Sequence, residues 1–181
     1  MEWIGYNSQA LTIILTAIGL ALTITGGFFA LLQWRQNIML KRSEIIKQIV
    51  DKLRYEKDMA DITYMVEYDR FKYTQEFHKD TQLEQRIDSL LALLDYACYL
   101  RTNNIIRKKE FSIIEYRVVR IVGRRDIQAY LWNLHHFAKA NRTVCSFSHL
   151  VEYGLKNRLF LEGFENSTCE LLIHKKFLNF R

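Results

Sequence analysis

The densest group of side chains that could bind a charged ligand lies between residues 108 and 125. Tyr116 and Tyr130 are close to it in the chain, and its members are Lys108, Lys109, Arg117, Arg120, Arg124 and Arg125. Guanidinium groups bind phosphate through paired hydrogen bonds, and aromatic rings stack on nucleobases. The cluster therefore predicts a site for a phosphate-bearing ligand such as a cyclic nucleotide. A solvated helix face, or a patch facing anionic lipid, would have the same composition.

A second candidate is the pair Arg142 and His149 in the segment RTVCSFSH. It is similar to the arginine and histidine pair of a family of helical ribonucleases, although Thr143 follows the arginine and the spacing is at the edge of that motif. The resemblance implies a membrane-tethered ribonuclease as one hypothesis. We favour the alternative, a structural arginine and a histidine satisfied by hydrogen bonds.

The acidic and histidine residues do not predict a metal site. Glu84, Asp88 and Asp95 share one face of a helix, but a metal cluster would need ligands from a second helix, such as a Glu-x-x-His pair, and the sequence has none. We expect a solvated acidic face that pairs with arginines. His135 and His136 are adjacent and point about 100° apart on a helix, so one should be in the core and one on the surface. We predict no metal, no cofactor and no catalytic residue.

These side chains must be positioned by helices. The sequence has no proline and only seven glycines, which is too few turn residues for an all-β domain. Apolar residues recur at helical spacing, and we predict helices over about 58–75, 81–100, 105–122, 126–140, 146–159 and 168–178. A strand remains possible for the last segment, 168–181. Thr81 and Glu84 form a capping-box pattern, and Asp126 is a candidate helix cap.

An uncharged apolar segment of 23 residues precedes this domain, from Ala10 to Leu32. As a helix it spans roughly 34 Å, enough to cross a bilayer. It has no basic region before it and is longer than the apolar part of a signal peptide, so we expect a retained anchor. The predicted organisation is a short extracytoplasmic N-terminus (1–9), a transmembrane helix (10–34), a juxtamembrane helix (35–55) and a cytosolic all-α domain (56–181).

The charge distribution predicts the orientation of that anchor. All 26 lysines and arginines lie at or beyond Arg35, and 19 of the 20 acidic residues follow it, so the later part carries the difference, +7. Basic residues favour the cytoplasmic side of a span. We therefore expect a single-pass protein of the cell inner membrane with its N-terminus outside and its C-terminal domain in the cytoplasm.

Small residues recur at spacings of three and four within the apolar segment. They are Gly19, Thr23, Gly26, Gly27 and Ala30. Such a stripe lets two membrane helices approach closely, which predicts a homo-oligomer. The alternative is that small residues are simply common in membrane helices.

Two further stretches carry a resemblance to known proteins. They are Gln33-Trp34-Arg35, at the predicted membrane edge, and LEQRIDSLLALLDYACYLRTNNIIRKKEF, a helix, a polar turn and a second helix. The chain resembles uncharacterised bacterial single-span membrane proteins with a cytosolic all-helical domain. The resemblance implies that architecture, and it implies no activity or catalytic residues.

Three functional hypotheses follow. The first is a non-enzymatic, membrane-anchored and oligomeric interaction protein, whose basic domain binds a protein partner at the inner membrane face. The second is an effector of antiphage defence, whose domain senses a cyclic nucleotide or oligonucleotide and whose anchors disrupt the membrane. The third is the membrane-tethered ribonuclease.

Overall fold

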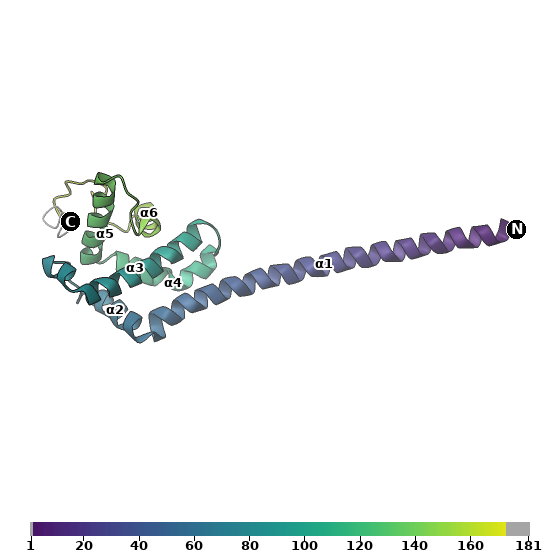
Figure 1. The fold of residues 1–181 in the computed structure, drawn as a ribbon, viewed down its shortest axis with the longest axis horizontal. Coiled ribbons are helices and arrows are strands. Elements are labelled where there is room, and N and C mark those ends of the chain that lie inside the picture. The colour runs from purple at the N-terminus through teal and green to yellow at the C-terminus, as the bar shows by residue number, and fades with distance from the viewer. Residues whose placement is uncertain (1, 173–181) are drawn as a thin grey trace. The chain divides into compact units, whose positions relative to one another are not determined.

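The computed structural model describes residues 2–172, and it describes side chains for residues 11–74 and 76–172. Regular structure within these ranges is entirely helical, as predicted (Figure 1). In chain order the elements are α1 (Glu2–Tyr55), α2 (Lys57–Glu67), the 3-10 helix η1 (Gln75–Lys79), α3 (Thr81–Thr102), α4 (Lys108–Val122), α5 (Arg125–Ala140) and α6 (Ser148–Lys156). The prediction of a long apolar helix followed by a helical bundle is therefore confirmed.

Residues 1–43 form one unit, which consists of the apolar part of α1. Every described side chain from Leu11 to Asn37 is exposed. The helix is long and apolar enough to cross a membrane, a property that membrane anchors and signal sequences share. An exposed apolar surface of this length is unstable in water, so it requires lipid or another covering.

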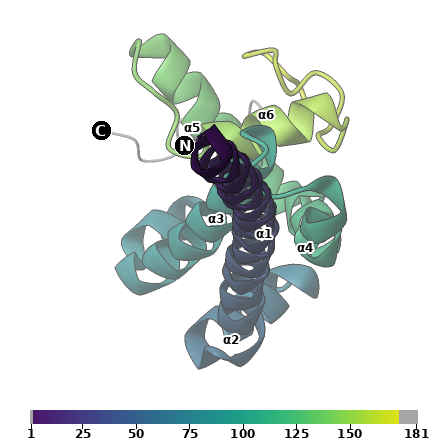
Figure 2. The ribbon, with the colours of Figure 1, turned by 90° about the vertical axis from the view of Figure 1, so that its right-hand side faces the viewer.

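Residues 44–181 form the second unit, whose core is organised around α3. This helix contacts α2, η1, α4 and α6, and α5 lies beside α6 in both views (Figures 1 and 2). The predicted apolar face of α3 is confirmed, because Ile87, Leu90, Leu91, Leu94 and Cys98 are fully buried. The last turns of α1 contribute to the same core through apolar side chains that include Ile46, Ile49 and Leu53.

Four of the predicted helices differ from the structure. The helix predicted over 146–159 is shorter and forms α6, Ser148–Lys156. The helix predicted over 58–75 ends at Glu67, because Asp69 adopts a left-handed conformation with φ of 58° and the chain then turns into the η1 loop. Helix α4 begins at Lys108 rather than at residue 105, since Ile106 is buried in the preceding loop. The segment from Thr168 to Leu172 forms turns, and the rest of the last predicted helix or strand lies outside the described residues.

Two predicted helix caps are also wrong, because the side chains of Glu84 and Asp126 bind groups outside their own helices. The N-cap of α3 is Asp80, whose Oδ1 accepts a hydrogen bond from the backbone N–H of Leu83 at 3.1 Å. Glu84 instead contacts His78. Asp126 lies inside α5, and its Oδ1 accepts the backbone N–H of Tyr73 at 2.9 Å. It therefore fixes the η1 loop instead of capping a helix.

The carboxylates of α3 connect this helix to three other elements. Glu84 Oε1 lies 2.7 Å from His78 Nδ1 of η1, and Asp88 Oδ1 accepts the hydroxyl of Tyr130 on α5 at 2.8 Å. Asp95 Oδ1 accepts the backbone N–H of Leu150 at 2.8 Å. We expected these carboxylates to form a solvated face that pairs with arginines, and this prediction is wrong, because none of these three contacts involves an arginine. The three carboxylates bind groups that belong to η1, α5 and α6.

Burial gives one of these contacts a predictable dependence on pH. Burial raises the pKa of Asp88 above its ordinary value of 3.8, and the hydrogen bond from Tyr130 opposes that rise only in part. Because the pKa is higher in the folded chain, the charged form of Asp88 weakens folding, and stability falls as pH rises through that pKa. We therefore expect Asp88→Asn to increase the free energy of unfolding more at about pH 7 than at about pH 3, where the aspartic acid is protonated in both states.

Urea unfolding of the full chain in detergent, followed by near-ultraviolet circular dichroism at both pH values, measures this difference. Asp61→Asn, at an exposed position of α2, is the control and should show little difference between the two pH values. An equal effect of Asp88→Asn at both pH values would contradict the prediction.

Candidate functional site: an arginine and tyrosine surface on α2 and α4

Helix α4 has one buried face and one exposed face. The predicted apolar stripe of Phe111, Ile114, Val118 and Ile121 is buried against the rest of the bundle. The opposite positions are exposed although several of them are large and apolar, and Tyr116 is 63% exposed. An exposed aromatic and aliphatic surface on a packed helix is a candidate for binding.

Exposed tyrosines and half-buried arginines of α2, its C-cap and α4 gather on this side of the bundle. The rings of Tyr64 and Tyr68 stack with centroids 6.0 Å apart. The guanidinium carbon of Arg117 lies 6.0 Å from the Tyr64 centroid, and that of Arg120 lies 5.9 Å from Tyr68 and 5.7 Å from Tyr116. These distances are those of cation–π contacts. We call this set, Tyr64, Tyr68, Tyr116, Arg117 and Arg120, the Arg–Tyr surface.

A buried acidic residue of α2 fixes two arginines beside this surface. Glu67 is 6% exposed, and its Oε1 lies 3.1 Å from Arg117 Nη1. Arg124 donates a hydrogen bond from Nη2 to the backbone carbonyl of Glu67. The bond of Arg117 joins the end of α2 to α4, and the bond of Arg124 joins it to the start of α5. Arg120 is held by the tyrosines, and its Nη1 donates to the Tyr116 hydroxyl.

The six basic residues singled out in the sequence do not share one site. Arg117 and Arg120 lie on the α2 side of α4, and Arg124, the N-cap of α5, also contacts the end of α2. Lys108 and Lys109 lie in the first turn of α4, about 14 Å along the helix from Arg117. Arg125 is the first residue of α5 and is exposed. Binding of phosphate by any of them stays a prediction.

The sequence analysis missed Tyr64 and Tyr68. Their spacing of four residues was the available signal, because residues at that spacing lie on one face of a helix. The segment was interpreted only through its buried positions. Their proximity to α4 depends on helix packing, which the sequence does not reveal.

The small residues of the apolar helix are exposed, and they are Gly19, Thr23, Gly26, Gly27 and Ala30. A Cβ atom added at any of the three glycines would meet no atom within 4 Å. The Thr23 hydroxyl donates to the carbonyl of Gly19 at 2.8 Å, so it is satisfied within the helix. The stripe is therefore accessible to a second helix, and the homo-oligomer stays a prediction.

The histidines that the sequence singled out pack against aromatic rings. His136 is buried and its Nε2 lies 2.9 Å from the carbonyl of Phe164, whereas His135 is half-buried. His149 packs its ring 5.0 Å from that of Tyr99, and Arg142 is exposed in the turn after α5. The buried Nδ1 of His149 has no hydrogen-bond partner in the described part of the chain, so the expectation of a histidine satisfied by hydrogen bonds is wrong. No group of histidine, cysteine, aspartate or glutamate in the described part of the chain has the arrangement of a metal site. The ribonuclease hypothesis stays untested.

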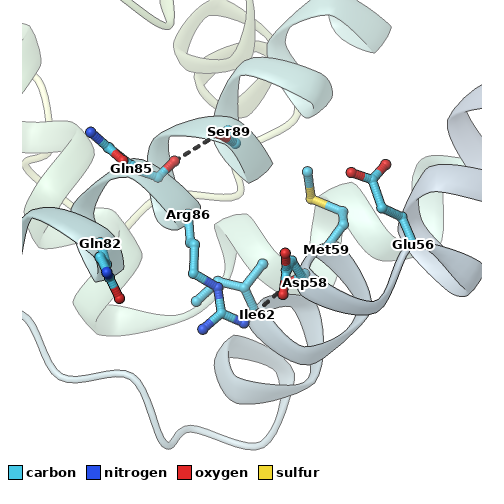
Figure 3. A pocket seen from close by; sticks show the side chains of 8 residues that line it. All are labelled: Glu56, Asp58, Met59, Ile62, Gln82, Gln85, Arg86 and Ser89. Atoms are coloured by element: carbon cyan, nitrogen blue, oxygen red, sulfur yellow. Dashed lines mark hydrogen bonds between the residues drawn. The ribbon is translucent and has the colours of Figure 1, made fainter.

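A concave site of about 480 Å³ lies between the start of α2 and the first turns of α3 (Figure 3). Arg86 extends from α3 towards α2, where its Nη2 donates to the carbonyl of Asp58 at 3.2 Å. Glu56, Asp58, Gln82 and Gln85 surround it together with apolar side chains. One arginine and two carboxylates line this site, so the charge does not favour an anion. The arginine holds α2 against α3.

A carboxylate, a histidine and a tyrosine hydroxyl form a hydrogen-bond network that connects α3 to the η1 loop. Glu84 Oε1 contacts His78 Nδ1, His78 Nε2 lies 3.0 Å from the Tyr73 hydroxyl, and that hydroxyl accepts Asn133 Nδ2 at 3.0 Å. Such a network has the composition of an activated nucleophile. However, Tyr73 is 0% exposed, and burial raises its pKa to about 12. The hydroxyl is therefore protonated and shielded from substrates. The hydrogen-bond network stabilises the η1 loop instead.

No protein-family model, curated protein or solved structure matches this chain. The resemblance to bacterial single-span proteins therefore rests on architecture, a long apolar N-terminal helix followed by a helical domain.

The hydroxyl of Tyr73 should contribute measurably to stability. We expect Tyr73→Phe to lower the free energy of unfolding by about 1–3 kcal/mol, because it removes a buried hydrogen-bond partner from His78 and Asn133. Denaturant unfolding of the full chain in detergent measures the loss. Tyr55→Phe removes a hydroxyl from an exposed position and should change stability by less than about 0.5 kcal/mol. Equal effects of the two substitutions would contradict this assignment.

Proposed function

We propose that this chain is a membrane-anchored, non-enzymatic interaction protein of the cell inner membrane. Its helical domain binds an acidic protein partner at the cytoplasmic face. The observation that carries the proposal is the Arg–Tyr surface, an exposed group of tyrosines and a guanidinium on a domain that follows a membrane-length apolar helix.

The apolar helix supports the anchor. It carries no charged side chain from Ala10 to Leu32, and its described side chains are exposed. Transfer of a leucine or isoleucine side chain out of water contributes about 1.5–3 kcal/mol, so a row of them strongly favours lipid. The lysines and arginines all follow the segment, which favours a cytoplasmic domain.

The chemistry of the Arg–Tyr surface suits a protein partner. Tyrosine and arginine are enriched among the residues that dominate protein–protein binding energy. Arg120 lies against two tyrosine rings. Its side chain is therefore partly ordered before a partner binds, which lowers the entropy cost of binding. A planar guanidinium binds a carboxylate with two parallel hydrogen bonds. Ile113 and Val119 are exposed on the same helix and offer apolar contact. An acidic segment with apolar side chains is complementary to this surface.

The same residues favour a second candidate, the antiphage-defence effector. Arg120 can bind a phosphate, and Tyr68 and Tyr116 can stack on bases. In this alternative, a cyclic nucleotide or oligonucleotide is the ligand, and oligomeric anchors disrupt the membrane once it is bound.

The anchor is tested with a full chain that carries one epitope tag at each end. We expect one protein species of full-length mass that carries both tags. It should remain in the membrane pellet after alkaline extraction. Replacing Ile18 and Leu22 together by arginine should release or destabilise it, because each charge at the centre of a span costs about 2.5–3.5 kcal/mol. The matched control replaces both by alanine. Loss of the N-terminal tag, with a shortened soluble chain, would show a cleaved signal sequence and contradict the anchor.

The Arg–Tyr surface is tested with the full chain in nanodiscs of neutral lipid. The probe is a fluorescent peptide of alternating glutamate and leucine. We expect Arg120→Glu to weaken its binding at least about tenfold, which corresponds to about 1.4 kcal/mol. Arg125→Glu makes the same change in charge at an exposed residue outside the surface and should retain most of the affinity.

A cyclic dinucleotide is titrated against the same variants. Binding of the nucleotide that depends on Arg120 but not on Arg125, without binding of the peptide, would favour the defence effector. Equal loss of peptide binding in both variants would contradict a defined surface and leave only general attraction of charges.

A further inference from the structure

A second concave site lies at the other end of α4, away from the Arg–Tyr surface. It has a volume of about 340 Å³ and is lined by the end of α3, the start of α4 and the end of α6. Arg101, Lys108 and Lys156 each contribute from a different helix. This volume lies at the lower end of the range of small-molecule sites, which is about 300–1,000 Å³.

The cations that line this cavity outnumber its carboxylates by three to two. None of Arg101, Lys108 and Lys156 makes an ion pair within the described part of the chain. The lining carboxylate of Glu115 accepts the hydroxyl of Tyr153 at 2.7 Å, and Glu152 is exposed. Three cations therefore converge on one concavity with two carboxylates, one of which is already bonded to a tyrosine.

The floor and the start of α4 add to this arrangement. The buried ring of Phe111 packs edge-on against Tyr153, with centroids 5.3 Å apart. Lys108 is the first residue of α4, a helix of 15 residues, and the backbone N–H groups at a helix start attract anions. The carboxylate of Glu110 already accepts the N–H of Arg107 there. Asn104 and Asn157 also line the cavity. Asn104 Oδ1 accepts a hydrogen bond from Arg101 Nη1 at 3.4 Å, and Asn157 Nδ2 donates to the carbonyl of Tyr153 at 2.8 Å.

We propose that this cavity binds a small phosphate-bearing anion. Lys108 and Lys156 neutralise the phosphate from opposite walls, and Arg101 donates hydrogen bonds to it. The cavity of Figure 3 lacks this preference, because one arginine and two carboxylates line it. The proposal is independent of the anchor and of the Arg–Tyr surface, with which this cavity shares no residue.

A simpler role for two of the cations must be separated from ligand binding. Arg101 and Lys156 lie in the last turns of α3 and α6, where positive charge stabilises a helix end. That role predicts a change in the stability of the ligand-free chain. It predicts no change in the affinity for a phosphate compound, and it does not involve Lys108 at all.

The experiment uses the full chain in neutral nanodiscs and pyrophosphate as the probe. Isothermal titration calorimetry measures the affinity at constant ionic strength, with sulfate as the reference anion. We expect saturable binding of pyrophosphate that is at least about tenfold tighter than that of sulfate. Lys108→Glu and Lys156→Gln should each weaken it by about tenfold or more. Lys109→Glu is the matched control, because Lys109 is the next residue of the same helix and does not line the cavity.

Two results would overturn the proposal. One is the absence of saturable pyrophosphate binding to the unmodified chain. The other is an equal loss of affinity in Lys108→Glu and Lys109→Glu, which would indicate general attraction of charge. Circular dichroism checks that each variant is folded, and Lys108→Gln replaces Lys108→Glu if the latter fails that check.

Discussion

The arrangement of the helical unit depends on one row of carboxylates. Glu84, Asp88 and Asp95 lie along α3, and each accepts a hydrogen bond or contacts a ring nitrogen from a different element. Apolar packing alone would let helices slide or rotate, since side chains of similar volume can often be exchanged. A buried or half-buried carboxylate with one specific donor admits far fewer arrangements. The row therefore determines where η1, α5 and α6 lie around α3.

The sequence was sufficient for the architecture, because that depends on local periodicity. The apolar segment, the face of α3 and the stripe of α4 follow from spacing alone. The two predictions of helix caps were wrong for a physical reason. Glu84 and Asp126 have the residue types of caps, but each binds a group that is distant in the chain or outside its own helix. Local preference is worth about 1 kcal/mol, and a buried tertiary bond outweighs it.

The basic cluster illustrates the same limit for function. Its residues are close in sequence, but the structure separates them. Arg117 and Arg124 contact Glu67, Arg120 belongs to the Arg–Tyr surface and Lys108 lines the cavity at the start of α4, whereas Lys109 and Arg125 belong to none of these places. Arg101 and Lys156 join Lys108 from helices whose proximity no sequence pattern predicted. Neighbouring arginines on one helix therefore do not define one site. The partner of each side chain depends on which helix packs beside it.

The bond from Asp95 to the start of α6 has a consequence for the order of folding. Helix α6 has nine residues, and its own N-cap residue, Phe147, provides no side-chain hydrogen bond. Isolated helices of this length are marginal in water. The cap comes from α3, which is synthesised earlier and is already available when α6 leaves the ribosome. Helix α6 is therefore a conditional element, formed on docking and released as a unit when the contact opens. Amide hydrogens of α6 would then exchange with solvent before those of α3.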